Sequence, residues 1–383
     1  MDTKKFDDIR REQFPLTEKC AYLDTATTGV VSINSRNAMI EFIEKIHDEG
    51  MDMNDFNENW NHADNLRNLV AELINADADE IFFSGSGSDM LNIFSNGIEI
   101  KENSNIVLSG LSFPSTPYTW MNRIGVENVR IAEPENGQIP AEKLFELVDE
   151  DTLAISLCLV ENTTGFYHDI ELISKFCQEH GIYLVLDITQ SVGAMELDVK
   201  KTPVDFLVAT TYKWLGGVFG FSFGYISKRI IDQVKPTYVG WTGNKNRTDH
   251  SRYKLDLSDG ANRFETGSLN WIGLKGIEES INIYLKLGKR DVEEYILSLT
   301  DYLYEQIDGL KEVKIIGPFP KKNRSCISYI EFPEKWAIDD IILRNNKIRS
   351  HIANKNTMRI SLHYYNNFED IDKLIGFLKS YEE

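Results

Sequence analysis

The feature that most constrains the fold is a series of short apolar runs that alternate with helical patterns between about residue 80 and residue 226. Several runs are apolar at successive positions, which is typical of strands covered on both faces, and helical patterns such as residues 170–180 lie between them. The candidate strands are residues 81–83, 105–108, 129–132, 153–159, 182–187, 205–209 and 222–226. The alternation predicts an α/β fold with a mostly parallel, doubly wound sheet.

The pattern changes after about residue 272. A long helical stretch is followed by a predicted strand at 326–332, a helix near 338–344, a strand at 358–362 and a terminal helix. This order indicates a smaller α+β domain. We therefore expect three parts, which are an N-terminal helical segment packing near the small domain (1–20), a large domain (21–272) and a small C-terminal domain (273–383).

Charge and cysteine usage narrow the partners and the compartment. The net charge of −19 repels phosphate backbones and anionic lipids, so we expect neither nucleic acid nor a membrane as a partner. We also expect no signal peptide and no transmembrane helix. The four cysteines show no CxxC or metal-like spacing, which is typical of reduced thiols in a cytoplasmic protein, and Cys158 lies in an apolar run that predicts core packing.

An acid and a lysine follow two neighbouring predicted strands. Asp187 ends one strand, and Lys213 comes 26 positions later (213 minus 187), a few residues past the next strand. The carboxyl ends of parallel strands meet at one edge of a sheet, where ligands collect. Pyridoxal phosphate needs an amine to hold its aldehyde as a Schiff base and a carboxylate to keep its ring nitrogen protonated. Asp187 and Lys213 meet both needs.

A loop rich in small residues favours a phosphate site. The segment FSGSGSDMLN at residues 83–92 follows a predicted strand and opens a helix. Small residues let backbone N–H groups approach a phosphate, and the positive end of the helix adds to the attraction. A flexible Gly/Ser turn is the alternative, and the lysine of a P-loop is missing.

Together with this loop, Asp187, Lys213 and the segment NTTG at residues 162–165, the chain resembles the class V aminotransferases of fold type I. That superfamily includes aminotransferases, cysteine desulfurases and related C–S lyases, kynureninase-like enzymes and epimerase-like proteins. The resemblance extends from YLDTATTG at residues 22–29 to RISLHYYN at 359–366. It implies a seven-stranded sheet in the large domain, pyridoxal 5'-phosphate as cofactor, and a homodimer.

The resemblance also implies roles for individual residues. Lys213 is the Schiff-base lysine, which moves the α-proton once it is released from the cofactor. Asp187 is the partner of the ring nitrogen, while Gln190 and Asn162 lie near the phenolate oxygen. Arg359 grips the substrate carboxylate through two parallel hydrogen bonds, with a structural salt bridge as the alternative. Substrate binding is assigned to Arg359, Thr27 and Asn162.

The remaining cofactor contacts include two departures from the family pattern. Phe113 stands where an aromatic side chain commonly stacks on the ring and where many desulfurases have histidine; an ordinary core residue is the alternative. Tyr212 replaces a histidine common in the family, so it brings no positive charge to the phosphate. The phosphate contacts are Ser86, Gly87, Ser88, Thr210 and Tyr212, with Ser268 reaching the neighbouring subunit's site.

The absence of a cysteine before Arg359 narrows the choice of reaction. Persulfide-forming desulfurases carry a nucleophilic cysteine shortly before the carboxylate arginine, whereas residues 347–357 contain none. The leading hypothesis is therefore an aminotransferase-like enzyme of amino-acid metabolism that acts on a small α-amino acid. A lyase that eliminates a β- or γ-substituent, including a C–S lyase without a persulfide cysteine, is the first alternative. An epimerase or racemase and a cofactor-binding regulatory protein remain open.

Overall fold

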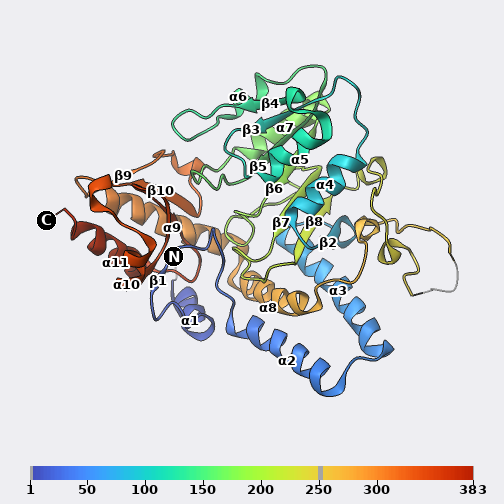
Figure 1. Ribbon diagram of the computed structural model, residues 1–383, viewed down its shortest axis with the longest axis horizontal. Helices are drawn as coiled ribbons and strands as arrows, with labels where there is room; N and C mark the ends of the chain where they lie inside the picture. Colours follow the sequence, from blue (N-terminus) through green and yellow to red (C-terminus); the bar gives the residue numbers. More distant parts are fainter. Residues whose placement is uncertain (1–2, 249–252, 383) are drawn as a thin grey trace.

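A seven-stranded sheet forms the centre of the larger part of the molecule (Figure 1). The computed structural model describes residues 3–248 and 253–382. The strand order is β2-β8-β7-β6-β5-β3-β4, and β8 runs antiparallel to the other strands, which all point the same way. The strands are β2 (Ile81–Ser84), β3 (Asn105–Ser109), β4 (Val129–Ala132), β5 (Thr152–Cys158), β6 (Tyr183–Asp187), β7 (Phe206–Thr210) and β8 (Ser222–Ile226). The predicted α/β fold with a mostly parallel sheet is confirmed.

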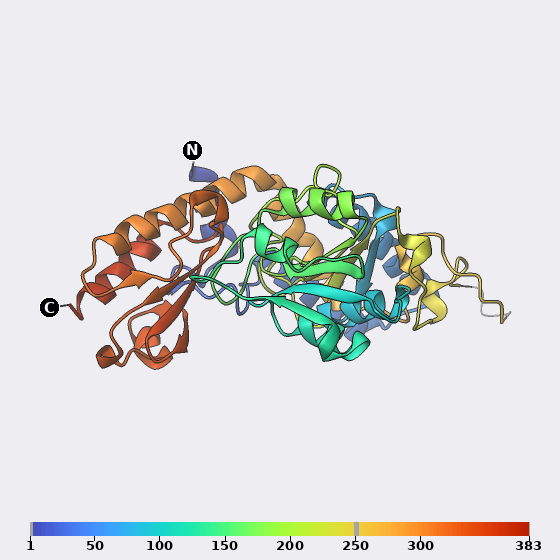
Figure 2. The ribbon, with the colours of Figure 1, turned by 90° about the horizontal axis from the view of Figure 1, so that it is seen from above.

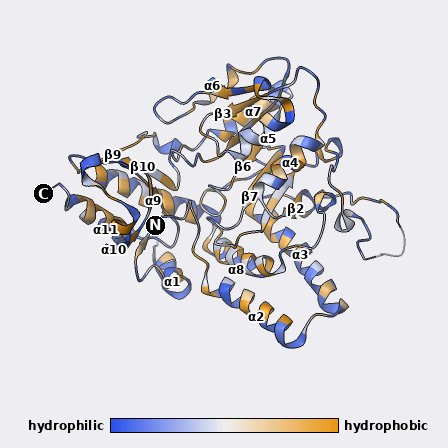
Figure 3. Ribbon diagram, viewed as in Figure 1, coloured by the Kyte–Doolittle hydropathy of each residue, from blue (hydrophilic) through white to orange (hydrophobic). Residues whose placement is uncertain are grey.

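Both faces of the sheet are covered, because alternate side chains of each strand enter different cores. Phe82 packs in one core, whereas Ile81 and Phe83 pack in the other. The first core lies under α4 (Gly87–Gly97) and α5 (Ser115–Ile124); the second lies under α3 (Met53–Ile74), α6 (Ala141–Phe145), α7 (Ile170–His180) and α8 (Trp271–Leu287). Figure 3 shows apolar residues along the central strands and mixed apolar and polar residues along the outer helices. Double coverage explains why the strand sequences are apolar without alternation.

The smaller part is built on a four-stranded antiparallel sheet of order β12-β13-β10-β9. Its strands are β9 (Lys314–Ile315), β10 (Ile327–Glu331), β12 (His351–Asn354) and β13 (Thr357–Ser361), and its helices are α9 (Lys289–Asp308), α10 (Asp340–Asn345) and α11 (Phe368–Lys379). Seen from above, this α+β unit forms one end of an elongated molecule (Figure 2). The described residues that lead up to residue 248, coloured yellow, lie at the opposite end.

The N-terminal helix α1 (Lys4–Gln13) packs against the smaller part, far from it in sequence. The ring of Phe6 stacks on Tyr295 with centroids 4.0 Å apart, and Arg10 Nη1 lies 2.6 Å from Asp370 Oδ2. β1 (Ala21–Tyr22) pairs in parallel with β11 (Ile348–Arg349). These contacts attach α1 and β1 to residues of the C-terminal part of the chain.

The connection between the two parts runs through α8, which packs against α2 (Ile33–Glu49) and α3 in the larger part. The division of the chain near residue 272 remains a prediction from the sequence pattern. Among the described residues, no helix combines the length and the apolar character needed to cross a membrane.

Candidate active site

A cavity of about 250 Å³ lies at the carboxyl edge of the large sheet. The elements around it end or begin at this edge, because parallel strands and the helices that follow them meet there. Nine of the residues predicted for the site line the cavity, namely Ser86, Gly87, Ser88, Phe113, Asp187, Gln190, Thr210, Tyr212 and Lys213. The structure therefore brings together residues that are up to 127 positions apart (213 minus 86).

Lys213 is almost fully enclosed, with 9% of its surface exposed. Burial lowers the pKa of Lys213 to about 8, although the Asp187 carboxylate partly opposes this shift and the Arg359 guanidinium adds to it. A substantial fraction of the side chain is therefore a neutral amine at mildly alkaline pH. A neutral amine can attack a carbonyl carbon or accept a proton, whereas an ammonium group can do neither.

Asp187 closes β6 at the floor of the cavity. Its Oδ1 accepts a hydrogen bond from the backbone N–H of Thr189 at 2.8 Å. Burial is the largest influence on this carboxyl group and raises its pKa. A cationic ring nitrogen placed beside Asp187 would favour the ionised carboxylate, since opposite charges stabilise each other strongly where water is excluded. The buried acidic side chain of Asp187 thus fits a protonated pyridine ring.

The opposite end of the cavity is suited to an anion. The helix α4 begins at Gly87, and its N-cap Ser86 accepts a hydrogen bond from Asp89 N at 3.1 Å. Ser88 Oγ lies 2.8 Å from Ser115 Oγ. The hydroxyl of Thr210 is buried beside the hydroxyl of Tyr212. These hydroxyl groups and the positive end of the helix fit a phosphate group.

Arg359 lies on β13 next to the cavity but does not line it. Its Nη2 donates to Asp24 Oδ1 at 3.0 Å and also to the hydroxyl of Thr27. The Nε atom is buried and has no partner. Because its charge lowers the pKa of Lys213, Arg359 is electrostatically coupled to the cavity. The predicted pair Arg359 and Thr27 is therefore in direct contact.

The two amides expected near the ring oxygen differ in their present contacts. Gln190 Nε2 donates to the carbonyl oxygen of Ala26 at 3.2 Å, and its Oε1 accepts from Trp214 Nε1 at 2.9 Å. A second amide N–H of Gln190 remains for the cavity. Asn162 does not line the cavity; its side-chain oxygen is buried without a partner, and its carbonyl oxygen accepts from Tyr329 at 2.7 Å.

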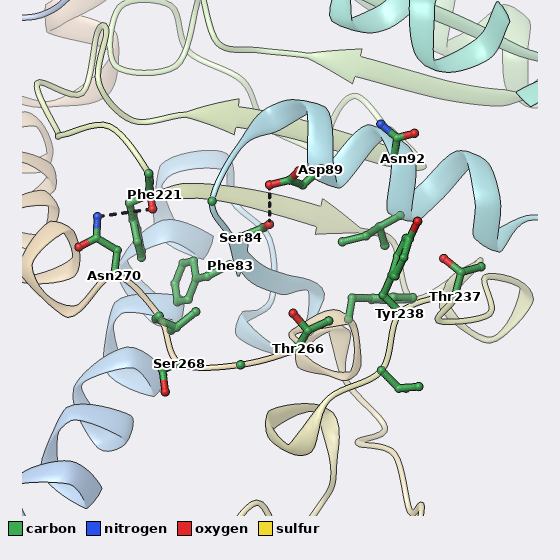
Figure 4. Close-up of a pocket in the computed structure, with 17 residues that line it drawn as sticks. Phe83, Ser84, Asp89, Asn92, Phe221, Thr237, Tyr238, Thr266, Ser268 and Asn270 are labelled. Atoms are coloured by element: carbon green, nitrogen blue, oxygen red, sulfur yellow. Dashed lines mark hydrogen bonds between the residues drawn. The ribbon is translucent and has the colours of Figure 1, made fainter. Parts of the chain in front are cut away.

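Ser268 lies outside this cavity, at a second and larger one of about 820 Å³. Figure 4 shows Ser268 in the segment that also carries Thr266 and Asn270, across from Ser84 and Asp89. Gly85 and Gly220 line both cavities, so the two are neighbours. Within one chain, Ser268 does not join the predicted phosphate contacts.

The sequence reasoning missed several wall residues. Cys158 was predicted to be core packing; it is buried, but it also borders the cavity, where its sulfur accepts from Phe113 N at 3.4 Å. Burial raises the pKa of this thiol well above its ordinary value, so it stays protonated. Thr189 and Phe219 also line the cavity. Thr189 stands beside Asp187 in the sequence, and Phe219 follows the glycines after Lys213. These positions were the available sequence signals for the cavity wall.

Gly29 gives a direct test of how tightly the lysine segment is held. A Cβ atom at this position would lie 1.9 Å from the carbonyl oxygen of Lys213, so the backbone would have to move. We expect Gly29→Ala to destabilise the protein by about 1–3 kcal/mol and to weaken cofactor binding. Thermal unfolding and cofactor titration measure both. Gly376→Ala is the control, because no atom lies within 4 Å of its Cβ; equal behaviour of the two variants would contradict the prediction.

The lysine pKa also predicts a pH dependence of stability. Burial lowers the pKa of Lys213 from 10.5 to about 8. Between these values the unfolded chain binds more protons than the folded one, so this group makes the free energy of unfolding rise with pH; below pH 8 the folded state bears the full cost of the buried charge. We expect K213M to be more stable than wild type near neutral pH.

The stability advantage of K213M should shrink by up to about 1.4 kcal/mol per pH unit as the pH rises from 8 to 10.5. Denaturant unfolding of the cofactor-free proteins across this range measures the difference between them. A difference that does not vary with pH would show that the folded lysine keeps its ordinary pKa.

The sequence matches the family described as Aminotransferase class-V over residues 21–374. A probable cysteine desulfurase of Methanothermobacter thermautotrophicus is 25% identical and the match covers 96% of each chain. A probable cysteine desulfurase of Borreliella burgdorferi is 28% identical, over 96% of this chain and 94% of the relative. The solved complex between the cystine C–S lyase C-DES and its reaction product cysteine persulfide has a TM-score of 0.86 at 20% identity and covers 96% of this chain and 99% of that one.

Proposed function

Since the chain belongs to the class V aminotransferase family, whose members depend on pyridoxal phosphate, we propose that it acts at the α-carbon of a small α-amino acid through Lys213. One observation carries the proposal: a buried lysine with a pKa lowered to about 8 shares one cavity with the buried carboxylate of Asp187. The hydroxyl groups of Thr210 and Tyr212 at the other end of the cavity support it.

Each group has a role that its position supports. Asp187 would hold the ring nitrogen, and the N-terminus of α4 with Ser86 and Ser88 would hold the phosphate. The bound cofactor supplies a sink for the electrons freed at the α-carbon. Lys213 Nζ would take the α-proton as a neutral amine and return it elsewhere, and the burial of the lysine limits competition from water for that proton.

Arg359 completes the substrate site from the small sheet. Its Nη2 contacts Asp24 and Thr27, and its Nε has no partner, so a substrate carboxylate that displaces these two contacts could accept from Nη2 and Nε together. An arginine close enough to influence the pKa of the reactive lysine favours a substrate that bears a carboxylate beside its amine, which is an α-amino acid.

Amino-group transfer is the reaction we propose first, and elimination with C–S cleavage is the second candidate. The second is favoured by the relatives, which are named probable cysteine desulfurases, and by the structural similarity to a cystine C–S lyase. All four cysteines are buried and burial raises the pKa of each thiol. Cleavage by this chain would therefore release sulfur without a protein thiolate as acceptor.

A panel of amino acids tests the choice. Each amino acid is incubated with the cofactor-loaded protein, with and without a keto acid acceptor, and the products are quantified. Amino-group transfer yields a new amino acid only when the acceptor is present. Elimination from cysteine or cystine yields pyruvate, ammonia and a sulfur product without an acceptor. Turnover of none of these substrates by a cofactor-loaded protein would sink the proposal.

We also propose a homodimer in which Ser268 of one subunit reaches the phosphate end of the other. The exposed side chains of Tyr238 and Val239 at the second cavity, 64% and 49% exposed, support a covered face. Co-expressing K213A and S268D chains should restore activity, because one site of each mixed dimer keeps both native residues. A monomer in sedimentation, or absence of complementation, would contradict the proposal.

The four free cysteines support a cytoplasmic location.

A further inference from the structure

A buried carboxylate, Glu161, lies behind the cavity and takes no part in the chemistry proposed above. Its side chain has no exposed surface, and the side chain of His168 beside it is 1% exposed. Glu161 Oε1 accepts a hydrogen bond from the hydroxyl of Ser109 and lies 2.8 Å from His168 Nε2. Burying polar side chains costs free energy unless they are hydrogen-bonded, so the presence of these two groups calls for an explanation other than packing.

On one side, Glu161 belongs to the hairpin that carries Asn162. The hairpin leaves β5 and returns through a bridge between Val160 and Tyr167. Within it, Glu161 N donates to Phe166 O at 3.0 Å, and Gly165 N donates to Glu161 O at 2.8 Å. His168 stands on the returning arm, next to the bridged Tyr167, so its contact with the Glu161 side chain ties the two arms together.

On the other side, Glu161 reaches the loop that carries Phe113. Ser109 ends β3, and its hydroxyl both donates to Glu161 and accepts from Leu111 N at 3.2 Å. The loop then delivers Phe113 to the cavity wall, where its ring centroid is 5.6 Å from Lys213 Nζ. One carboxylate therefore joins the two loops that bear Phe113 and Asn162.

We propose that Glu161, held by Ser109 and His168, is a positioning residue that fixes the loops bearing Phe113 and Asn162 and so holds the Phe113 ring at the wall of the cofactor cavity. This inference rests on the proposed function. The carboxylate touches neither substrate nor cofactor; it acts through the backbone of the two loops. Its hydrogen bonds, rather than its charge, transmit the effect, because Ser109 links it directly to Leu111 N. A glutamine of the same shape can still accept from Ser109.

Three variants test the proposal in the full-length protein. We expect Glu161→Ala to weaken the binding of pyridoxal phosphate, measured by absorbance titration, by at least about tenfold. Glu161→Gln should restore the affinity to within about threefold of wild type. Asp370→Asn is the control, because it disturbs a buried ion pair with Arg10, and neither of these two residues lines the cavity. It should lower the melting temperature and change the affinity less than about twofold.

A double-mutant cycle covers the case in which Glu161→Ala does not fold. Ser109→Ala should weaken cofactor binding about tenfold in wild type but less than about twofold in the Phe113→Ala background, because the two residues act through the same loop. Equal effects in both backgrounds, or loss of melting temperature without loss of affinity, would overturn the inference. If the wild-type protein does not bind pyridoxal phosphate, the proposed function is wrong as well. If the wild type binds the cofactor and all the variants bind it equally well, only the role proposed for Glu161 is wrong.

Discussion

Replacing Lys213 by alanine is expected to reduce turnover of amino acids by at least about 10⁴-fold. The side chain is the one amine among the cavity-lining residues, and burial lowers its pKa to about 8, so no neighbour in the wall can take over both nucleophilic attack and proton transfer. Steady-state turnover measures the effect. Mass spectrometry after borohydride reduction should find the cofactor attached to wild type and not to K213A.

The matched control for K213A is Lys275→Ala. Burial also lowers the pKa of Lys275, but its Nζ lies 3.0 Å from His62 Nδ1, and it does not line the cavity. Lys275→Ala should keep turnover within about threefold of wild type. If K213A retained wild-type turnover, the assignment of Lys213 as the catalytic amine would be wrong.

Replacing Arg359 by alanine is expected to lower kcat/KM for amino acids by about 10³-fold, with a smaller effect on cofactor affinity. Truncating one partner of a buried, hydrogen-bonded charge pair costs about 2–5 kcal/mol, and about 1.4 kcal/mol corresponds to a factor of ten. Most of the loss should appear in KM, because the arginine contacts the substrate carboxylate and not the reacting atoms. Steady-state kinetics with saturating cofactor measure the two constants.

The amide of the same amino acid separates carboxylate binding from structural damage. The amide lacks the anionic group, so wild type should prefer the acid strongly and R359A should show almost no preference. Arg359→Lys should fall between them, since an ammonium group keeps the charge but loses the paired donors. A preference for the acid that survives in R359A would mean that Arg359 serves only as a salt bridge to Asp24.

Much of the fold could be predicted because its signals are local. The helix α7 begins and ends where its sequence pattern predicted: Asp169 caps its start by accepting from Leu172 N at 3.3 Å, and Gly181 ends it in a left-handed conformation with φ of 66°. The seven strands of the large sheet lie within a residue or two of the predicted ranges. The two-residue pair β1 and β11 was not predicted, since Ala21 pairs with Ile348 and nothing near either residue marks the other.

The residues of the candidate site also fall into those that local sequence signals predicted and those that only the structure revealed. The residues at strand ends were found because the turn after each parallel strand returns to one edge of the sheet, and this placed Asp187, Lys213 and the α4 loop together. The contacts of Arg359 with Asp24 and Thr27 join residues more than 300 positions apart. Neither those contacts nor the cavity wall at Cys158 follow from sequence spacing.

The order of the apolar runs and the residues that end them thus determined, from sequence alone, an α/β sheet with an amine and a carboxylate at its edge. Only the tertiary structure decided how those groups behave. The pKa of Lys213 falls because distant segments exclude water from it, and Glu161 reaches Ser109 because β5 lies beside β3. Local sequence patterns determine where the chain enters and leaves a strand. The desolvation of a side chain and its hydrogen-bond partners depend on atoms that only the fold brings close.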